Sequence, residues 1–283
     1  MGKIHLFTFC VDIETHNKQY LLQVLNSLIN SLDKHNNNYE FHIFTNYDLQ
    51  IINPKIIIEE YFDKNENYFG NRGYQSKWLN LSWNKINIYK YLFDKYNINF
   101  LWIDLDTVVT ANIEYINEVD NYLIPIGGTN SELHSPFTND PTNKYGVPTH
   151  KYIQGNIWKL DIKLYNNLIT TFSEIQKNGL QLMWDIQTLI TYYIEFKLNG
   201  KITENNIYVS GLNYKPETMN GLCMHDKPEN HQHGGMESLI NMYYDNDKLR
   251  SKYHPNKEIH FVGFTMYSLK PLINTEQFKK LLG

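Results

Sequence analysis

The chain has 283 residues, of which 42% are hydrophobic and 20% are charged, and these values are ordinary for a globular protein with a sizeable core. A formal net charge of -4 provides no general field that would attract nucleic acid, so no nucleic-acid partner is expected. Two cysteines are too few for a disulfide framework. No stretch reaches the ~18 apolar residues that would span a bilayer. The N-terminus lacks the basic head and the cleavage site of a signal peptide, so we expect a soluble, cytoplasmic protein with no membrane span.

The first hundred residues alternate between strand-like and helix-like patterns. Continuous apolar runs of strand length predict buried strands, and apolar residues at helical spacing predict helices. By these criteria we expect strands at 4–11, 39–46 and 54–61, helices at 20–32 and 77–96, and a loop at 63–75. The order strand, helix, strand at the start of the chain is typical of a right-handed βαβ layer.

The rest of the chain is less periodic. We expect strands at 99–109, 123–126, 151–161 and 258–264, and helical structure over 162–197 with a break near 177–179. Residues 127–151 and 204–257 show no clear period. No repeat and no interdomain linker is visible. The sequence therefore predicts one α/β domain with a mostly parallel central sheet flanked by helices.

Two aspartates interrupt the apolar run at 99–109. Buried, unpaired carboxylates are costly, and a divalent cation would compensate them. In a strand, Asp104 and Asp106 project to one face with Leu105 opposite, so both are able to bind one ion at the carboxyl end of the strand. Oxygen ligands suit Mg²⁺ or Mn²⁺. The alternative is a pair of solvated acids that begin a loop.

The segment FLWIDLDTVV (100–109) resembles the donor-metal motif of retaining GT-A glycosyltransferases. The similar families are the glycogenin-like and bacterial galactosyltransferase group, and the group of fungal galactosyltransferases and plant xylosyltransferases. Four further segments fit these families in order: SWNKINIYKYL (82–92), YIQGNIWKL (152–160), MWDIQTLITYYI (183–194) and IHFVGFTMYSLKP (259–271). The resemblance extends from about residue 4 to residue 271.

This resemblance implies a single Rossmann-like GT-A domain over 1–283, with a donor-binding half at about 1–125. The acceptor side would occupy about 126–283, with 258–271 as a C-terminal lid. The implied reaction transfers a hexose or pentose from a UDP-sugar to a glycan, protein or lipid acceptor, with retention and with Mn²⁺ or Mg²⁺ as cofactor. The implied metal ligands are Asp104, Asp106 and His260, the catalytic residues are Asp185 and Gln187, and the substrate-binding residues are Val11, Asp12, Lys85, Gln154, Gly155, Asn156, Gly263 and Lys270.

Several of these residues also have ordinary structural interpretations. Lys85 is on a predicted helix, where most lysines are solvated. Asp185 precedes an apolar helical segment and is able to act as its N-cap. His260 lies in a short apolar strand, where a lone histidine is commonly a core residue.

Other functions remain open from the sequence. DLDTV also matches the core motif of haloacid-dehalogenase-like phosphatases, in which the first aspartate is a nucleophile. A nucleotidyltransferase would need a Gly- and Arg-rich phosphate loop after the first strand, and CVDIETHNK (10–18) contains none. A catalytically silent glycan-binding protein of the same fold is a third alternative. The Cys- and His-containing segment 222–235 suggests an acceptor-side loop more than a zinc site, because its ligand spacing is loose.

Overall fold

The computed structural model describes residues 2–11, 16–62, 74–126, 131–223 and 239–282. The fold is mixed α/β, and a mostly parallel seven-stranded sheet is its main element. The predicted fold class is confirmed at this level. None of the described helices has the length and apolarity needed to cross a bilayer.

The chain separates into two compact units, and each unit is assembled from distant stretches. Unit 1 comprises 1–61, 103–118 and 210–283, and unit 2 comprises 62–102 and 119–209. This division does not coincide with the boundary expected near residue 125. The sheet has the order β10-β6-β9-β4-β1-β2-β3, and β1 to β3 come from unit 1. Its remaining strands are β4 (Leu101–Ile103), β6 (Asn121–Pro125), β9 (Ile153–Lys159) and β10 (Ile207–Val209).

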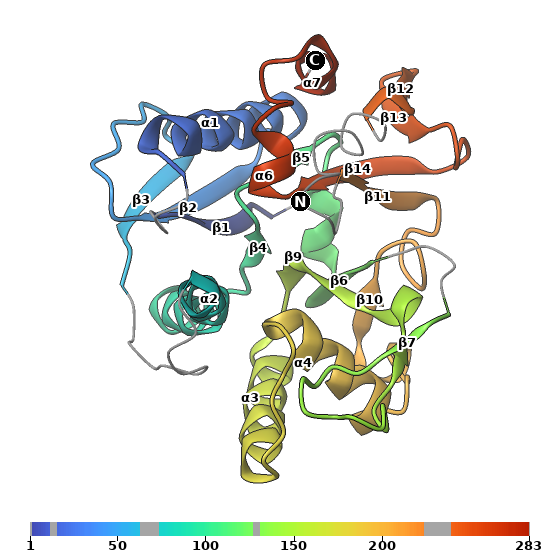
Figure 1. Ribbon diagram of the computed structural model, residues 1–283. Helices are drawn as coiled ribbons and strands as arrows, with labels where there is room; N and C mark the ends of the chain where they lie inside the picture. Colours follow the sequence, from blue (N-terminus) through green and yellow to red (C-terminus); the bar gives the residue numbers. More distant parts are fainter. Residues whose placement is uncertain (1, 12–15, 63–73, 127–130, 224–238, 283) are drawn as a thin grey trace. The chain divides into compact units, whose positions relative to one another are not determined.

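Unit 1 begins with the predicted βαβ layer. Its elements are β1 (Ile4–Cys10), α1 (Lys18–His35), β2 (Tyr39–Thr45) and β3 (Ile56–Glu60). β1 pairs with β2 in parallel, and β2 pairs with β3 in the same sense. α1 lies along these strands (Figure 1) and buries an apolar stripe that includes Leu21, Leu25, Leu28 and Leu32. Asn17 is the N-cap of this helix, and its side chain accepts a hydrogen bond from the Tyr20 amide at 2.8 Å.

A second, three-stranded sheet completes unit 1. It has the order β11-β14-β5, made of β11 (Thr218–Cys223), β14 (Glu258–Phe264) and β5 (Thr107–Val109). The chain then forms α6 (Met266–Leu269) and α7 (Glu276–Leu282), while β12 (Met242–Asp245) and β13 (Lys248–Ser251) form a hairpin. Residues 204–257, which show no clear period in the sequence, therefore include the strands β11, β12 and β13 of unit 1 as well as β10.

The expected lid at 258–271 is wrong for its first seven residues. β14 is the central strand of its sheet, with a strand on each side. Its residues from Ile259 to Phe264 are all buried. A strand that is hydrogen-bonded on both edges cannot swing as a lid without breaking both ladders.

Unit 2 contains the helices predicted in the middle of the chain. They are α2 (Tyr74–Tyr96), α3 (Ile162–Lys177) and α4 (Ile186–Tyr192), which continues into a π-helical turn, η3 (Tyr193–Lys197).

 The short 3₁₀ helix η1 (Glu114–Glu118) belongs to unit 1 instead. The break predicted near 177–179 is confirmed, because α3 ends at Lys177 and α4 starts only at Ile186.

The strands of unit 2 surround a largely irregular connection. β6 pairs antiparallel with β9 and parallel with β10. The stretch 127–151, which was predicted to be aperiodic, contains few regular elements among its described residues. They are the two-residue strands β7 (Leu133–His134) and β8 (Val147–Pro148) and the short helix η2 (Thr149–Lys151). A further single turn, η4 (Thr203–Asn205), precedes β10. The predicted loop at 63–75 lies mostly outside the described residues.

Candidate functional site

The acidic pair lies in a turn at the carboxyl end of β4. Asp104 follows the last residue of β4, and the Thr107 amide donates to the Asp104 carbonyl at 3.2 Å, which closes a four-residue turn. The expectation of one continuous strand is therefore wrong, and the argument from alternating faces does not apply. The turn leaves both carboxylates partly exposed while Leu105 stays buried. A continuous buried strand would have desolvated both charges, which is expensive.

The turn is attached to β14 and lies near the first turn of α1. The Phe264 amide donates to the Asp106 carbonyl at 3.0 Å. Burial raises the pKa of the Tyr20 hydroxyl, and the negative charge of Asp106 raises it further. The same hydroxyl donates to the Met266 carbonyl at 2.6 Å. Asp106, Tyr20 and the start of α6 are therefore close neighbours within unit 1.

Lys270 belongs to the same region, together with His16, Tyr20 and Tyr267, which the sequence analysis did not single out. The Lys270 ammonium is 6.0 Å from the centroid of the Tyr20 ring. The His16 ring lies 5.4 Å from the Tyr20 ring and 5.2 Å from the Tyr267 ring. Burial lowers the pKa of His16, and the charge of Lys270 lowers it further. The sequence feature that could have pointed to this region is the first turn of α1, which contains a basic residue and no acidic residue.

His260 is not brought to the acidic turn. In the antiparallel pairing of β14 with β5, the Thr110 amide donates to the His260 carbonyl, whereas it is Phe264 that meets Asp106. His260 and Phe264 are four residues apart, which is roughly 13 Å along a strand. The pairing register therefore argues against His260 as a ligand of an ion held by Asp106.

The His260 side chain has partners of its own. Its Nδ1 is 2.9 Å from the Tyr115 hydroxyl, and its Nε2 is 3.5 Å from a Glu258 carboxylate oxygen. The side chain is 10% exposed. Burial lowers the pKa of His260 against the opposing effect of the nearby carboxylates. These contacts correspond to the core-histidine interpretation.

The other predicted residues of unit 1 have different outcomes. Gly263 pairs with Thr107, so it lies beside the acidic turn. Val11 is buried and directly follows β1. Asp12 lies outside the described residues, as does almost all of the Cys- and His-containing segment 222–235.

In unit 2, the structure brings together Lys85, Asp185 and Gly155. The Lys85 ammonium is 3.8 Å from a carboxylate oxygen of Asp185 and donates to the Gly155 carbonyl at 3.5 Å. It also lies 4.6 Å from the centroid of the Trp102 ring. The side chains of Lys85 and Asp185 are only 8% and 5% exposed. Lys85 is therefore not a solvated helix lysine but one half of a buried ion pair.

Asp185 is at the same time the N-cap of α4. Its Oδ1 accepts from the Gln187 amide at 3.1 Å, as the structural interpretation predicted. The Gln187 side chain accepts from the Gly155 amide at 3.2 Å. A Cβ at position 155 would lie 3.2 Å from Gln187 Oε1 and 3.3 Å from Asp185 Oδ1. Glycine thus permits a close approach, and the Gln187 side chain is hydrogen-bonded to the backbone of β9.

Gln154 and Asn156 flank Gly155 on β9 and project to the opposite face of the strand. They are 5% and 8% exposed, and neither amide oxygen has a hydrogen-bond partner among the residues that the structure describes. Gln154 Nε2 donates weakly to the Ile126 carbonyl at 3.4 Å. Two buried acceptors without donors are unusual in a protein interior. They are suitable partners for hydroxyl groups of a ligand.

The acidic turn fits a divalent cation as a two-carboxylate site. Mg²⁺ and Mn²⁺ commonly bind through one or two carboxylates together with phosphate oxygens and water. Among the described residues there is no group of three or more His, Cys, Asp or Glu side chains arranged to hold a metal ion. Asp104 and Asp106 therefore supply the only protein ligands that we assign, and substrate oxygens would complete the coordination.

Comparison with known proteins gives no family assignment: no protein-family model matches the chain, and a search of curated proteins finds no significant match.

Proposed function

We propose that this protein is a metal-dependent glycosyltransferase that uses a nucleotide-sugar donor, with a UDP-sugar as the favoured donor. The observation that carries the proposal is the turn at the carboxyl end of β4, which presents Asp104 and Asp106 partly exposed, with Tyr20 close to both Asp106 and Lys270. Ligands of open α/β sheets bind beyond the carboxyl ends of the strands. The resemblance of five sequence segments to retaining GT-A enzymes supports the same conclusion.

Unit 1 would bind the diphosphate of the donor. Asp104 and Asp106 would hold Mn²⁺ or Mg²⁺, which supplies charge neutralisation for the leaving nucleoside diphosphate. The Lys270 ammonium would add a second positive charge near the phosphate oxygens. The pairing of Gly263 with Thr107 keeps the backbone of β14 beside the turn, and glycine adds no side chain there.

Within unit 2, the residues around Asp185 offer polar groups that suit a sugar ligand. Asp185 is held rigidly by the Gln187 amide and by Lys85, so its carboxylate has a fixed direction. During transfer the bond from the anomeric carbon to the diphosphate oxygen breaks, a bond to the acceptor oxygen forms, and the acceptor proton passes to the leaving phosphate. The acceptor would be a glycan, a protein or a lipid.

The phosphatase alternative receives no support from the fold. In haloacid-dehalogenase-like phosphatases the D-x-D-x-T/V motif normally occupies the first strand of the fold. Here the DLDTV motif follows β4, after a complete βαβ layer and two further elements.

The direct test is hydrolysis of UDP-sugars by the purified chain with Mn²⁺, and its loss in excess chelator. Asp106→Asn should reduce turnover by at least about a hundredfold, because the cation loses one of its two carboxylates, while the melting temperature stays near that of the wild type. Asp247→Asn is the matched control, since it removes an exposed carboxylate from the β12–β13 turn. Wild-type turnover in excess chelator would contradict the metal role. A product of inverted configuration, detected by NMR, would contradict retention.

A further inference from the structure

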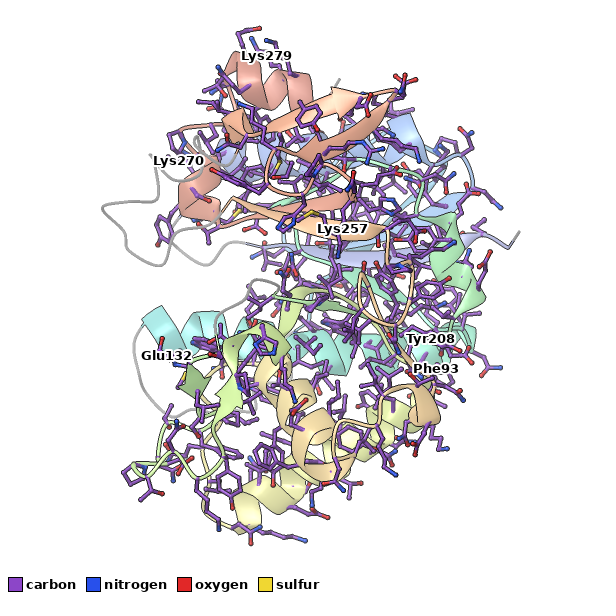
Figure 2. The ribbon with its side chains drawn as sticks, turned by 90° about the vertical axis from the view of Figure 1, so that its right-hand side faces the viewer. Phe93, Glu132, Tyr208, Lys257, Lys270 and Lys279 are labelled. Carbon is purple, nitrogen blue, oxygen red and sulfur yellow. The ribbon has the colours of Figure 1, made fainter. Side chains whose placement is uncertain are left out.

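The last strand of the seven-stranded sheet has an open edge. β3 ends the strand order on one side, and among the strands that the structure describes it pairs only with β2 (Figure 1). It has five residues and begins with three isoleucines. The strand at the opposite edge, β10, has only three residues and carries Tyr208, which is labelled in Figure 2. Short edge strands offer little backbone for pairing, so β3 is better suited than β10 to accept a further strand.

The pairing of β3 with β2 shows which backbone groups face outward. The Tyr61 amide, directly after β3, donates to the Thr45 carbonyl of β2 at 3.0 Å. Alternate residues of a strand direct their backbone groups to alternate edges, so the amide and carbonyl of Ile58 and the amide of Glu60 point away from β2. Ile58 is also 38% exposed. A strand that pairs on one side leaves such groups available to a partner strand.

A cavity lies at the carboxyl ends of β2 and β3. It has a volume of about 420 Å³, within the range of roughly 300–1,000 Å³ that is common for ligand pockets. Its lining comes from two stretches, 45–48 and 58–61. Ile58 and Glu60 belong both to this lining and to the outward edge of β3. A strand that pairs with β3 would therefore bring its side chains to the cavity.

The cavity is acidic. Its lining includes three carboxylates, those of Asp48, Glu59 and Glu60. None of the described residues that line it is a lysine or an arginine. Glu59 lies 3.2 Å from Nδ1 of the buried His42, whereas Asp48 and Glu60 are exposed. The Lys18 ammonium, 5.2 Å from the centroid of the Tyr47 ring, supplies one positive charge nearby. Negative charge is therefore in excess, and a cationic side chain suits this cavity.

We propose that the edge of β3 and the adjoining cavity bind an extended, basic segment of a partner protein by strand addition. The backbone of this segment would pair with Ile58 and Glu60, and one of its lysine or arginine side chains would enter the cavity. In this mode backbone hydrogen bonds give affinity and side-chain pockets give specificity. A second copy of this chain is a poorer partner, because each copy brings three carboxylates to the contact. The inference does not depend on the reaction proposed for the acidic turn.

The charge preference is tested by calorimetric titration of the full chain with two synthetic peptides. They are acetyl-Thr-Val-Lys-Val-Lys-Val-Thr-amide and the same peptide with glutamate in place of lysine. The lysine peptide should bind at least about tenfold more tightly, because like charges across an interface are costly. Glu60→Gln should weaken its binding by about threefold, as expected for one exposed charge pair. Asp247→Asn, which removes an exposed carboxylate from the β12–β13 turn, is the control and should have no effect.

The backbone pairing is tested at Ile58. Ile58→Pro removes the outward amide, and proline is tolerated at edge positions of this kind. It should weaken binding of the lysine peptide by about tenfold or more, because one backbone hydrogen bond is lost and the ring crowds the added strand. Ile58→Thr is the matched control, since it keeps the amide and a side chain that favours strands. The threonine variant should bind within about threefold of the wild type.

A measurement on the wild type covers the case in which Ile58→Pro does not fold. Hydrogen exchange of the Ile58 and Glu60 amides should slow when the lysine peptide is added, while the Ile57 and Glu59 amides, which face β2, should change little. The proposal is overturned if the lysine peptide does not bind at millimolar concentration, if both peptides bind alike, or if exchange at Ile58 and Glu60 is unchanged. Dimers in sedimentation that Ile58→Pro abolishes would assign the edge to a second copy and would equally overturn it.

Discussion

Lys85 and Asp185 form a buried pair whose energetic role is testable by a double mutant. Lys85→Met should lower the free energy of unfolding by roughly 3 kcal/mol, because it leaves the Asp185 carboxylate buried without its cation. Adding Asp185→Asn should restore most of the loss, since an amide oxygen still caps α4. The measurement is urea unfolding of the single and double variants.

The control for this pair is Lys90→Met on the same helix. Lys90 pairs with Asp94 four residues later, and both side chains are substantially exposed. Exposed pairs of this kind contribute at most about 0.5 kcal/mol. Equal losses for Lys85→Met and Lys90→Met would show that the Lys85 ion pair is not buried in solution.

Substitution of His260 distinguishes between two roles of this residue, a core residue and a metal ligand. His260→Ala should lower the free energy of unfolding by about 2 kcal/mol, because the Tyr115 hydroxyl loses its partner and a cavity forms. Binding of UDP in the presence of Mn²⁺ should stay within about twofold of the wild type, since a side chain with no contact to the ion contributes little to its affinity. The exposed His254→Ala is the control. A selective loss of metal-dependent binding with unchanged stability would restore His260 as a ligand.

At the scale of elements, α1 is joined to the segment after β5 through one asparagine. Asn36 is fully buried, and its side-chain oxygen accepts from the Ile113 amide at 2.8 Å. Its Nδ2 donates to the carbonyls of Leu32 and Ala111, at 3.4 Å each. One side chain therefore satisfies backbone groups of two separate segments.

Removing this link should destabilise unit 1. Asn36→Ala should lower the free energy of unfolding by about 2–3 kcal/mol, because a buried amide and a buried carbonyl lose their partner. Asn30→Ala, at an exposed position of the same helix, should change it by less than about 0.5 kcal/mol. Thermal and urea unfolding of both variants provide the measurement. Similar effects at the two positions would contradict the role of Asn36 as a link.

At the scale of the whole molecule, the buried and partly buried histidines predict acid sensitivity. Burial lowers the pKa of His5, His16, His35 and His260, and all four belong to unit 1. Below the ordinary histidine pKa of 6.5, the unfolded chain therefore binds more protons than the folded chain. Stability is fully present above pH 6.5 and falls as the pH decreases toward the folded-state values.

The measurement is the free energy of unfolding between pH 7.5 and pH 5, chosen around the histidine pKa of ~6.5, with hydrogen exchange to localise the change. Unit 1 should lose protection before unit 2 as the pH falls. A His260→Phe variant should show a shallower pH dependence, because one buried titrating group is gone. A flat profile over this range would show that the histidines are solvated in the folded state.

The sequence by itself determined most of the regular elements. Their apolar periods are local properties, so β1, α1, β2 and β14 lie close to their predicted ranges. Capping residues are equally local, and Asp185 was foreseen as the N-cap of α4. The mixed α/β class follows from the order of these elements.

Tertiary structure alone decided which side chains meet. The register of β14 against β5 joins residues about 150 positions apart, and it separates His260 from Asp106 although both lie in recognisable motifs. The chain also turns at Asp104, and Lys270 lies where its charge acts on His16. Register depends on hydrogen bonds and packing between distant segments, so no local period in the sequence encodes it.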